Sequence, residues 1–109
     1  MDSNYAKYIK EREGKNIIED EHGFATYLFQ DDFVYIEDIY VVPESRKLNK
    51  ASKYADEICK IAKNDGYSKA MGTVNVLAAG ATRNVTVLIK YGFEITSTND
   101  NIIYFMKSI

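Results

Sequence analysis

The chain has 109 residues, 14 basic against 16 acidic side chains, a formal net charge of −2 and a hydrophobic fraction of 46%. This length predicts one domain, spanning residues 1–109, and excludes large barrels and most multidomain enzymes. The apolar content is typical of a folded protein, and no run reaches the roughly 18 apolar residues of a membrane span. The charge balance disfavours a nucleic-acid binder, which usually carries a basic excess.

Cysteine and histidine are scarce, with Cys59 and His22 the only examples. A lone thiol cannot form an internal disulfide and the N-terminus lacks an apolar leader, so we expect a cytoplasmic protein. The same scarcity argues against a metal site made of protein ligands and against a Cys/His or Ser/His catalytic pair. We interpret Cys59 as a packing residue and His22 as a solvated turn residue.

The residue pattern predicts a mixed α/β fold with about three helices around a central mixed β-sheet. Asp2 or Ser3 is the expected cap of the first helix, and Pro43 is expected to end the third strand. Early strands joined by tight turns and later strands separated by helices favour a mixed sheet over an all-parallel one. The expected elements are a helix at 3–12, strands at 16–20, 24–29 and 33–42, a helix at 49–64, a strand at 68–77, a helix at 82–91, and strands at 93–96 and 102–107.

The most informative stretch is residues 36–58, where a strongly apolar strand ends at a proline and a basic loop enters a helix. The N-terminus of a helix offers free backbone N–H groups and a positive dipole end, which suit a phosphate group. Arg46, Lys47 and Lys50 add positive charge at this point. The stretch therefore predicts a phosphate-binding loop.

This stretch resembles the acetyl-coenzyme A motif of the GNAT superfamily of N-acetyltransferases, in which V-x-P precedes R-x-x-G-x-G/A at the start of a helix. Val41-Val42-Pro43 matches the first part, and Arg46 to Ala51 occupies the second. Tyr91-Gly92-Phe93 resembles the end of the family's second core helix. The resemblance implies a GNAT-like acyl-CoA N-acyltransferase fold, with acetyl-CoA as cosubstrate and no metal.

The resemblance also implies which residues bind the cosubstrate. Backbone groups of the strand end would bind the pantetheine arm, and the loop and the first helical turn would hold the pyrophosphate. An ordinary paired strand is the alternative for the first group. The implied contacts are Ile39, Tyr40 and Val41 for pantetheine, and Arg46, Lys47, Leu48, Asn49, Lys50, Ala51 and Ser52 for pyrophosphate.

Three departures from the family pattern bear on activity. Asn49 replaces the first loop glycine, but asparagine tolerates a positive φ and so can keep the loop path. Leu88 stands where the family often has a tyrosine as general acid, and Tyr91 lies on another face of the helix. A single helix before the first strand stands in place of the two that usually wall the acceptor pocket.

Glu37 interrupts the apolar strand and is the candidate catalytic base. Within the resemblance, a carboxylate here deprotonates the acceptor ammonium, and burial beside aromatic residues would raise its pKa toward a useful value. Asp38 is a weaker candidate, and either carboxylate can instead be a solvated strand residue. The expected reaction is acetyl transfer to a primary amine of a protein lysine, a polyamine or a similar molecule. A catalytically degenerate GNAT-fold interaction module is the alternative, and a homodimer remains open.

Overall fold

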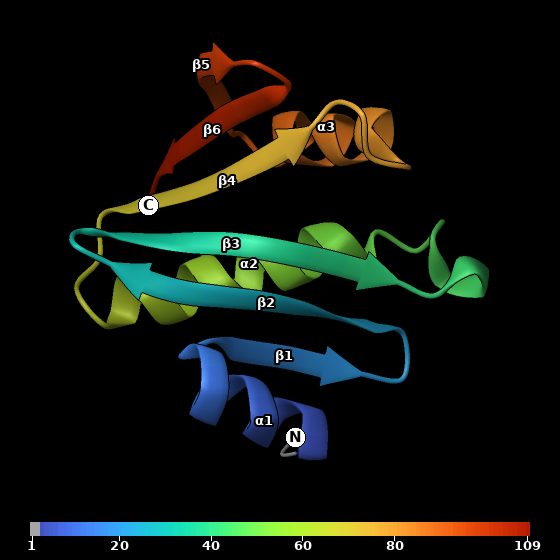
Figure 1. The fold of residues 1–109 in the computed structure, drawn as a ribbon, viewed down its shortest axis with the longest axis vertical. Helices are drawn as coiled ribbons and strands as arrows, with labels where there is room; N and C mark the ends of the chain where they lie inside the picture. Colours follow the sequence, from blue (N-terminus) through green and yellow to red (C-terminus); the bar gives the residue numbers. More distant parts are fainter. Residues whose placement is uncertain (1–2) are drawn as a thin grey trace.

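The computed structural model describes residues 3–109, so Asp2, the alternative helix cap, lies outside the described residues. A six-stranded mixed sheet with the order β1-β2-β3-β4-β6-β5 carries three α-helices and one short 3-10 helix (Figure 1). This confirms the predicted fold class. The elements are α1 (Asn4–Glu13), β1 (Asn16–Asp20), β2 (Gly23–Gln30), β3 (Phe33–Val41), η1 (Pro43–Ser45), α2 (Lys50–Asn64), β4 (Lys69–Asn75), α3 (Ala81–Lys90), β5 (Glu94–Asn99) and β6 (Ile102–Ser108).

Helix α1 has defined signals at both ends. The Ser3 side chain accepts a hydrogen bond from the Ala6 N–H at 3.0 Å, as expected of an N-cap residue. Gly14 ends the helix in the left-handed conformation, with a φ of 67°. The helix packs along β1, and its buried residues are Ala6 and Ile9. The chain therefore leaves α1 along a fixed path into Lys15 and β1.

Strands β1, β2 and β3 form an antiparallel meander with one irregularity. Thr26 of β2 is opposite Asp38 of β3, whereas the next residue, Tyr27, is opposite Ile36. This register shift leaves Glu37 without a partner on β2, which makes it the extra residue of a β-bulge. Bulges redirect the side chains around them, so the candidate base lies where the regular pairing between β2 and β3 is interrupted.

The parallel junction between β3 and β4 is short. Its four residue pairs run from Phe33–Lys69 to Ile36–Gly72, although β3 continues to Val41 and β4 to Asn75. The crossover between these strands contains α2. Figure 1 shows α2 and α3 on the same face of the sheet, with β3 and β4 diverging from each other at the end nearer the α2 N-terminus.

The core lies between α2 and the sheet. The α2 residues Tyr54, Ala55, Ile58 and Ala62 are buried, as the helical spacing of small and apolar residues predicts. They share one cluster with Ala25, Val34, Ile36, Val41, Ala70, Val74, Leu88, Phe93 and Phe105. Cys59 is also buried in this cluster, which agrees with its interpretation as a packing residue.

The C-terminal part of the chain departs from expectation at one strand. In α3, which precedes it, Leu88 is buried and Ile89 is exposed. The strand expected at 93–96 begins at Glu94 and extends to Asn99. Every residue of this edge strand is exposed, so no alternation of apolar residues marks its bounds in the sequence. Its extent depends on pairing with β6.

Candidate active site

The diverging ends of β3 and β4 leave one edge of β3 open. The Val42 N–H donates to the His22 carbonyl at 2.8 Å, so the backbone groups of Val42 face β2. Backbone groups alternate between the two edges of a strand, so those of Tyr40 also face β2, whereas those of Ile39 and Val41 face the gap toward β4. Of the three residues expected to offer backbone groups to a ligand, Ile39 and Val41 therefore have the required direction.

The Val41 carbonyl is bonded to a loop side chain. Its oxygen accepts a 2.9 Å hydrogen bond from Nε of Arg46. The Arg46 guanidinium carbon also lies 5.9 Å from the centre of the Tyr40 ring, in a cation–π contact. The loop arginine thus lies over the end of β3, beside the open strand edge.

The loop that follows β3 delivers the chain into α2 through Asn49. This residue has a φ of 57° and a ψ of 29°, the left-handed conformation that glycine would adopt most easily. The first bond at the start of α2 runs from the Lys53 N–H to the Asn49 carbonyl at 3.2 Å. The three residues before Lys53 precede this bond, so their N–H groups have no acceptor within the helix. Those residues are Lys50, Ala51 and Ser52.

His22 supports this loop and is not simply a solvated turn residue. Its Nδ1 lies 2.9 Å from Oγ of Ser45, which is buried in η1. Its Nε2 lies 3.3 Å from a carboxylate oxygen of Glu21. The turn between β1 and β2 is therefore joined to the segment that precedes the basic loop, a contact that adjacent residues in the sequence could not reveal.

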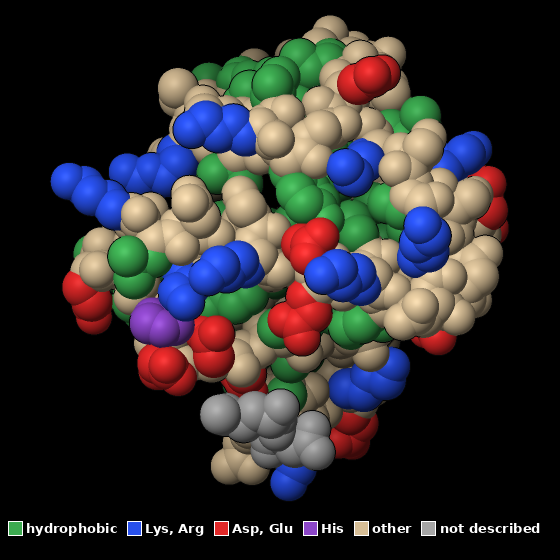
Figure 2. Space-filling view, turned by 180° about the vertical axis from the view of Figure 1, so that it is seen from behind, with side chains coloured by type: hydrophobic (Ala, Val, Ile, Leu, Met, Phe, Trp, Pro, Cys, Tyr) green, Lys and Arg blue, Asp and Glu red, His purple; other side chains and the backbone are tan. Residues whose placement is uncertain are grey.

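The face that carries α2 and α3 is hollowed near its middle. Figure 2 shows this hollow with hydrophobic side chains on its floor and Lys and Arg side chains around it.

The Tyr91 hydroxyl donates to Oδ1 of Asp56 at 2.7 Å and so joins the end of α3 to α2. Burial, followed by this bond to a carboxylate, raises the pKa of Tyr91, which disfavours it as a replacement acid. Leu88 is buried and has no proton to donate.

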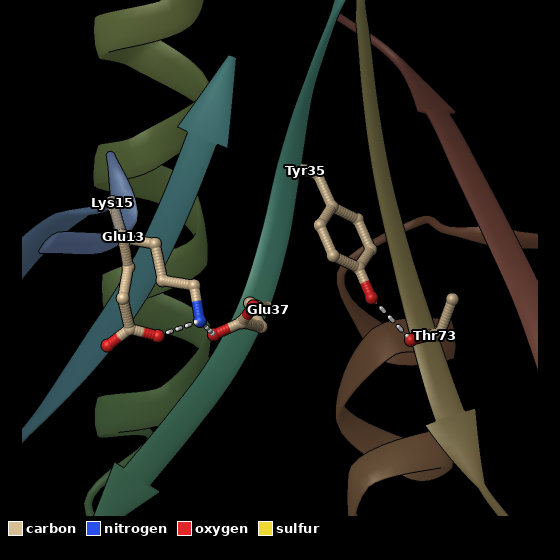
Figure 3. Close-up of polar contacts among 5 residues, drawn as sticks. All are labelled: Glu13, Lys15, Tyr35, Glu37 and Thr73. Atoms are coloured by element: carbon tan, nitrogen blue, oxygen red, sulfur yellow. Dashed lines mark hydrogen bonds and ion pairs between the residues drawn. The ribbon is translucent and has the colours of Figure 1, made fainter. Parts of the chain in front are cut away.

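Glu37 lies on the other face of the sheet. Val34 and Ile36 are buried in the core, so the alternation along β3 directs Tyr35 and Glu37 away from it. A Glu37 carboxylate oxygen lies 2.8 Å from Nζ of Lys15, which also lies 3.0 Å from a carboxylate oxygen of Glu13 (Figure 3). The candidate base is thus paired with an ammonium group, an arrangement that the sequence did not predict.

The charges in this group influence one another. The hydrogen bonds to Glu37 and then to Glu13 raise the pKa of Lys15 well above its usual range, so its amine stays protonated. Desolvation, and then the Glu37 carboxylate, raise the pKa of Asp38. Asp38 is exposed and is paired with Thr26 of β2, whereas Glu37 is the unpaired residue of the bulge.

One further polar contact crosses from β3 to β4. The Tyr35 hydroxyl lies 2.7 Å from Oγ1 of Thr73, just beyond the last residue pair of the junction (Figure 3). Sequence reasoning missed both residues, although Tyr35 precedes Glu37 by two positions and alternation alone places the two on one face. The contact connects the strands where they begin to diverge.

One segment of the chain carries three features in order: the open edge of β3, the left-handed residue before α2, and the free N-terminus of α2. A family model described as the acetyltransferase (GNAT) family matches residues 4–93. The chain belongs to the GNAT family. A search of curated protein sequences gives no significant match.

Solved GNAT structures share the fold at low sequence identity. The PaiA N-acetyltransferase of Thermoplasma acidophilum, in complex with coenzyme A, is 18% identical, with a TM-score of 0.73 over 81% of this chain and 54% of that chain. A GNAT family acetyltransferase of Elizabethkingia anophelis, with acetyl-CoA bound, is 16% identical, with a TM-score of 0.73 over 98% and 86%. The Bacillus subtilis acetyltransferase in complex with CoA is 14% identical, with a TM-score of 0.70 over 94% and 83%.

The present chain thus spans about half the length of the first of these proteins and most of the other two. Among residues 3–109, no helix combines the length and the apolar character needed to cross a membrane.

Proposed function

We propose that this GNAT protein transfers the acetyl group of acetyl-CoA to a primary amine, either a lysine side chain or a small polyamine-like molecule. The observation that carries the proposal is the open edge of β3, which leads through the left-handed Asn49 to the free N-terminus of α2. An extended amide chain and a phosphate group are the two chemical units that such a surface binds. Acetyl-CoA contains both.

Different parts of this segment would bind the two units of acetyl-CoA. Ile39 and Val41 direct backbone groups into the gap, where they can pair with the amides of the pantetheine arm. The first turn of α2 offers N–H groups to the pyrophosphate, and Lys47 and Lys50 add positive charge. Asn49 keeps the loop path that a glycine would give. Arg46 lies between the two regions and must release the Val41 carbonyl if the ligand binds there.

The reaction needs no covalent intermediate on the protein. Glu37 would accept a proton from the acceptor ammonium, and a backbone N–H at the open edge of β3 would stabilise negative charge developing on the acetyl oxygen. Glu37 faces away from α2 and α3, so the amine and the acetyl donor would approach from opposite faces of the sheet. With Leu88 in place of a tyrosine, the thiolate would take its proton from solvent.

Calorimetric titration of the full chain with acetyl-CoA tests the binding half of this proposal. Lys50→Ala should weaken binding several-fold, because Lys50 is the first residue of α2. Lys63→Ala is the matched control, since Lys63 is an exposed lysine in the last turn of the same helix and should leave the affinity unchanged. Absence of binding at millimolar acetyl-CoA would refute the proposal.

Release of the coenzyme A thiol in the presence of lysine peptides and polyamines tests the chemical half. Glu37→Gln should lower turnover by about 100-fold, the usual scale of general base catalysis, while acetyl-CoA still binds. Asp38→Asn is the neighbouring control and should have a much smaller effect. Equal turnover in the wild type and Glu37→Gln would remove Glu37 as the base.

A further inference from the structure

Lys15 is held beside Glu37 by the backbone as well as by charge. Gly14 ends α1 in a left-handed conformation, and the Lys15 N–H then donates to the Ile9 carbonyl at 3.2 Å. This fixes the start of the Lys15 side chain, whose Nζ lies 2.8 Å from Glu37 and 3.0 Å from Glu13. The Lys15 side chain is only 23% exposed. Its position is therefore set by the end of a helix, unlike that of a freely moving surface lysine.

The ammonium of Lys15 meets the requirements for an acetyl acceptor. It is a primary amine, and it contacts the carboxylate that the proposed mechanism uses as base. Glu37 is the unpaired residue of the bulge and directly follows the last β3–β4 pair, Ile36–Gly72. An external amine acceptor would need to reach this same carboxylate. Lys15 thus occupies the place that an acceptor ammonium would take.

We propose that Lys15 is an acetyl acceptor within its own chain, an inference that rests on the proposed acetyltransferase function. Glu37 takes one proton from the ammonium, and the freed amine attacks the acetyl carbonyl carbon. A carbon–nitrogen bond forms and the carbon–sulfur bond of the thioester breaks. The ammonium loses two protons, one through Glu37 to solvent and one directly to solvent, and the departing thiolate takes one proton from solvent to become the thiol.

Acetylation would change the site that performs it. An acetylated Lys15 carries no charge, so its ion pairs with Glu37 and Glu13 are lost. Glu37 is then free to meet an external ammonium. In this scheme Lys15 competes with other acceptors until it is modified.

Spontaneous acetylation would produce the opposite pattern among the lysines. An amine must lose its proton before it can react, and the two carboxylates raise the pKa of Lys15. Lys10 lies on the exposed surface of α1, where its Nζ donates to the neutral Asn16 side chain at 2.9 Å. Lys10 is therefore the matched control, and without catalysis it should react faster than Lys15.

The experiment incubates the full wild-type chain with isotopically labelled acetyl-CoA and measures the label on each lysine by peptide mass spectrometry. We expect Lys15 to acquire the label about 100-fold faster than Lys10, at a rate independent of protein concentration. Trace labelling with acetic anhydride, in the absence of coenzyme, should show the reverse order. Unfolding the chain in urea should remove the difference in both reactions.

Three outcomes would overturn the inference. They are equal labelling of the two lysines by acetyl-CoA, labelling of Lys10 first, and a Lys15 rate that rises in proportion to protein concentration. Each of these leaves the proposed function intact if calorimetry shows that acetyl-CoA binds and an added amine is acetylated. Absence of acetyl-CoA binding would instead refute the proposed function itself.

Discussion

At Gly23 the backbone of β2 approaches that of β3 more closely than any side chain would permit. A Cβ atom added there would lie 1.9 Å from the Tyr40 carbonyl oxygen, and Gly23 has a φ of 155°. Both obstacles are backbone features, so neither can be relieved by rotation of a side chain. Gly23 therefore fixes how the turn between β1 and β2 packs against the end of β3, directly before the basic loop.

We predict that Gly23→Ala lowers the free energy of unfolding by about 3 kcal/mol, measured by urea denaturation. Gly66→Ala is the control, because Gly66 also has a positive φ, of 91°, but open space around it. That variant should lose only about 1 kcal/mol, from backbone strain. Equal losses in the two variants would show that the contact with Tyr40 is unimportant.

Asn49 allows the effect of backbone conformation to be separated from that of the side chain. Asn49→Gly keeps the left-handed φ without strain and removes side-chain atoms from the loop, so it should tighten acetyl-CoA binding in calorimetry. Asn49→Val places a β-branched residue in that conformation and should cost about 1–2 kcal/mol of stability as well as affinity. Weaker binding by Asn49→Gly would contradict the role that we give to the loop path.

Between elements, the clearest polar connection joins β1 to α2. The buried Tyr54 donates its hydroxyl to Oδ1 of Asp20 at 2.5 Å, and this bond is the main cause of the lowered pKa of Asp20. The unfolded chain therefore takes up a proton on Asp20 at a higher pH than the folded chain does. Stability from this bond is present above the unfolded pKa of about 3.9 and is lost as the pH falls through the lower folded value.

We predict that Tyr54→Phe lowers the free energy of unfolding by about 1 kcal/mol at pH 7, because the carboxylate is exposed and solvent screens the bond. The difference from the wild type should shrink as the pH falls below about 4, in urea titrations over a series of buffers. A difference that stays constant down to pH 2 would mean that lost packing, rather than the bond to Asp20, causes the effect.

The elements that the sequence predicted best are those whose pattern is local. The strand Asn16–Asp20 has the predicted bounds, and the apolar stripe of α2 is buried as its spacing required. The left-handed conformation at Asn49 agrees with the expectation, which came from the glycine of the family motif and from the tolerance of asparagine for a positive φ. These features depend on neighbours within a few positions, which is the range over which periodicity and turn chemistry are informative.

The features that sequence reasoning missed depend on distant pairing. Glu37 is a bulge residue only because of the register between β2 and β3, and Lys15 meets it from the far end of α1. The contact between Tyr35 and Thr73 requires β3 and β4 to be neighbours, which the order of elements does not specify. The candidate base could thus be predicted as a residue type in a strand, but its charged partner could not.

At the scale of the whole molecule, the β3–β4 gap divides the sheet into two parts joined by four residue pairs. The amides of Ile39 and Val41 face this gap, whereas the Val42 amide is bonded to His22. We predict that the first two exchange with solvent much faster than Val42 in hydrogen-exchange NMR, and that acetyl-CoA slows them selectively. If all three exchange at one rate with and without ligand, the ligand does not bind along this edge.

The short parallel junction also has a consequence for how the chain folds. Strands β1, β2 and β3 are joined by tight turns, and β5 and β6 by another, so their pairings need little loop closure. The β3–β4 pairs, in contrast, close the long segment that contains the whole of α2, which carries a larger entropic cost. The slow step of folding should therefore be the union of the two parts of the sheet, and the gap for the ligand lies along the boundary that forms last.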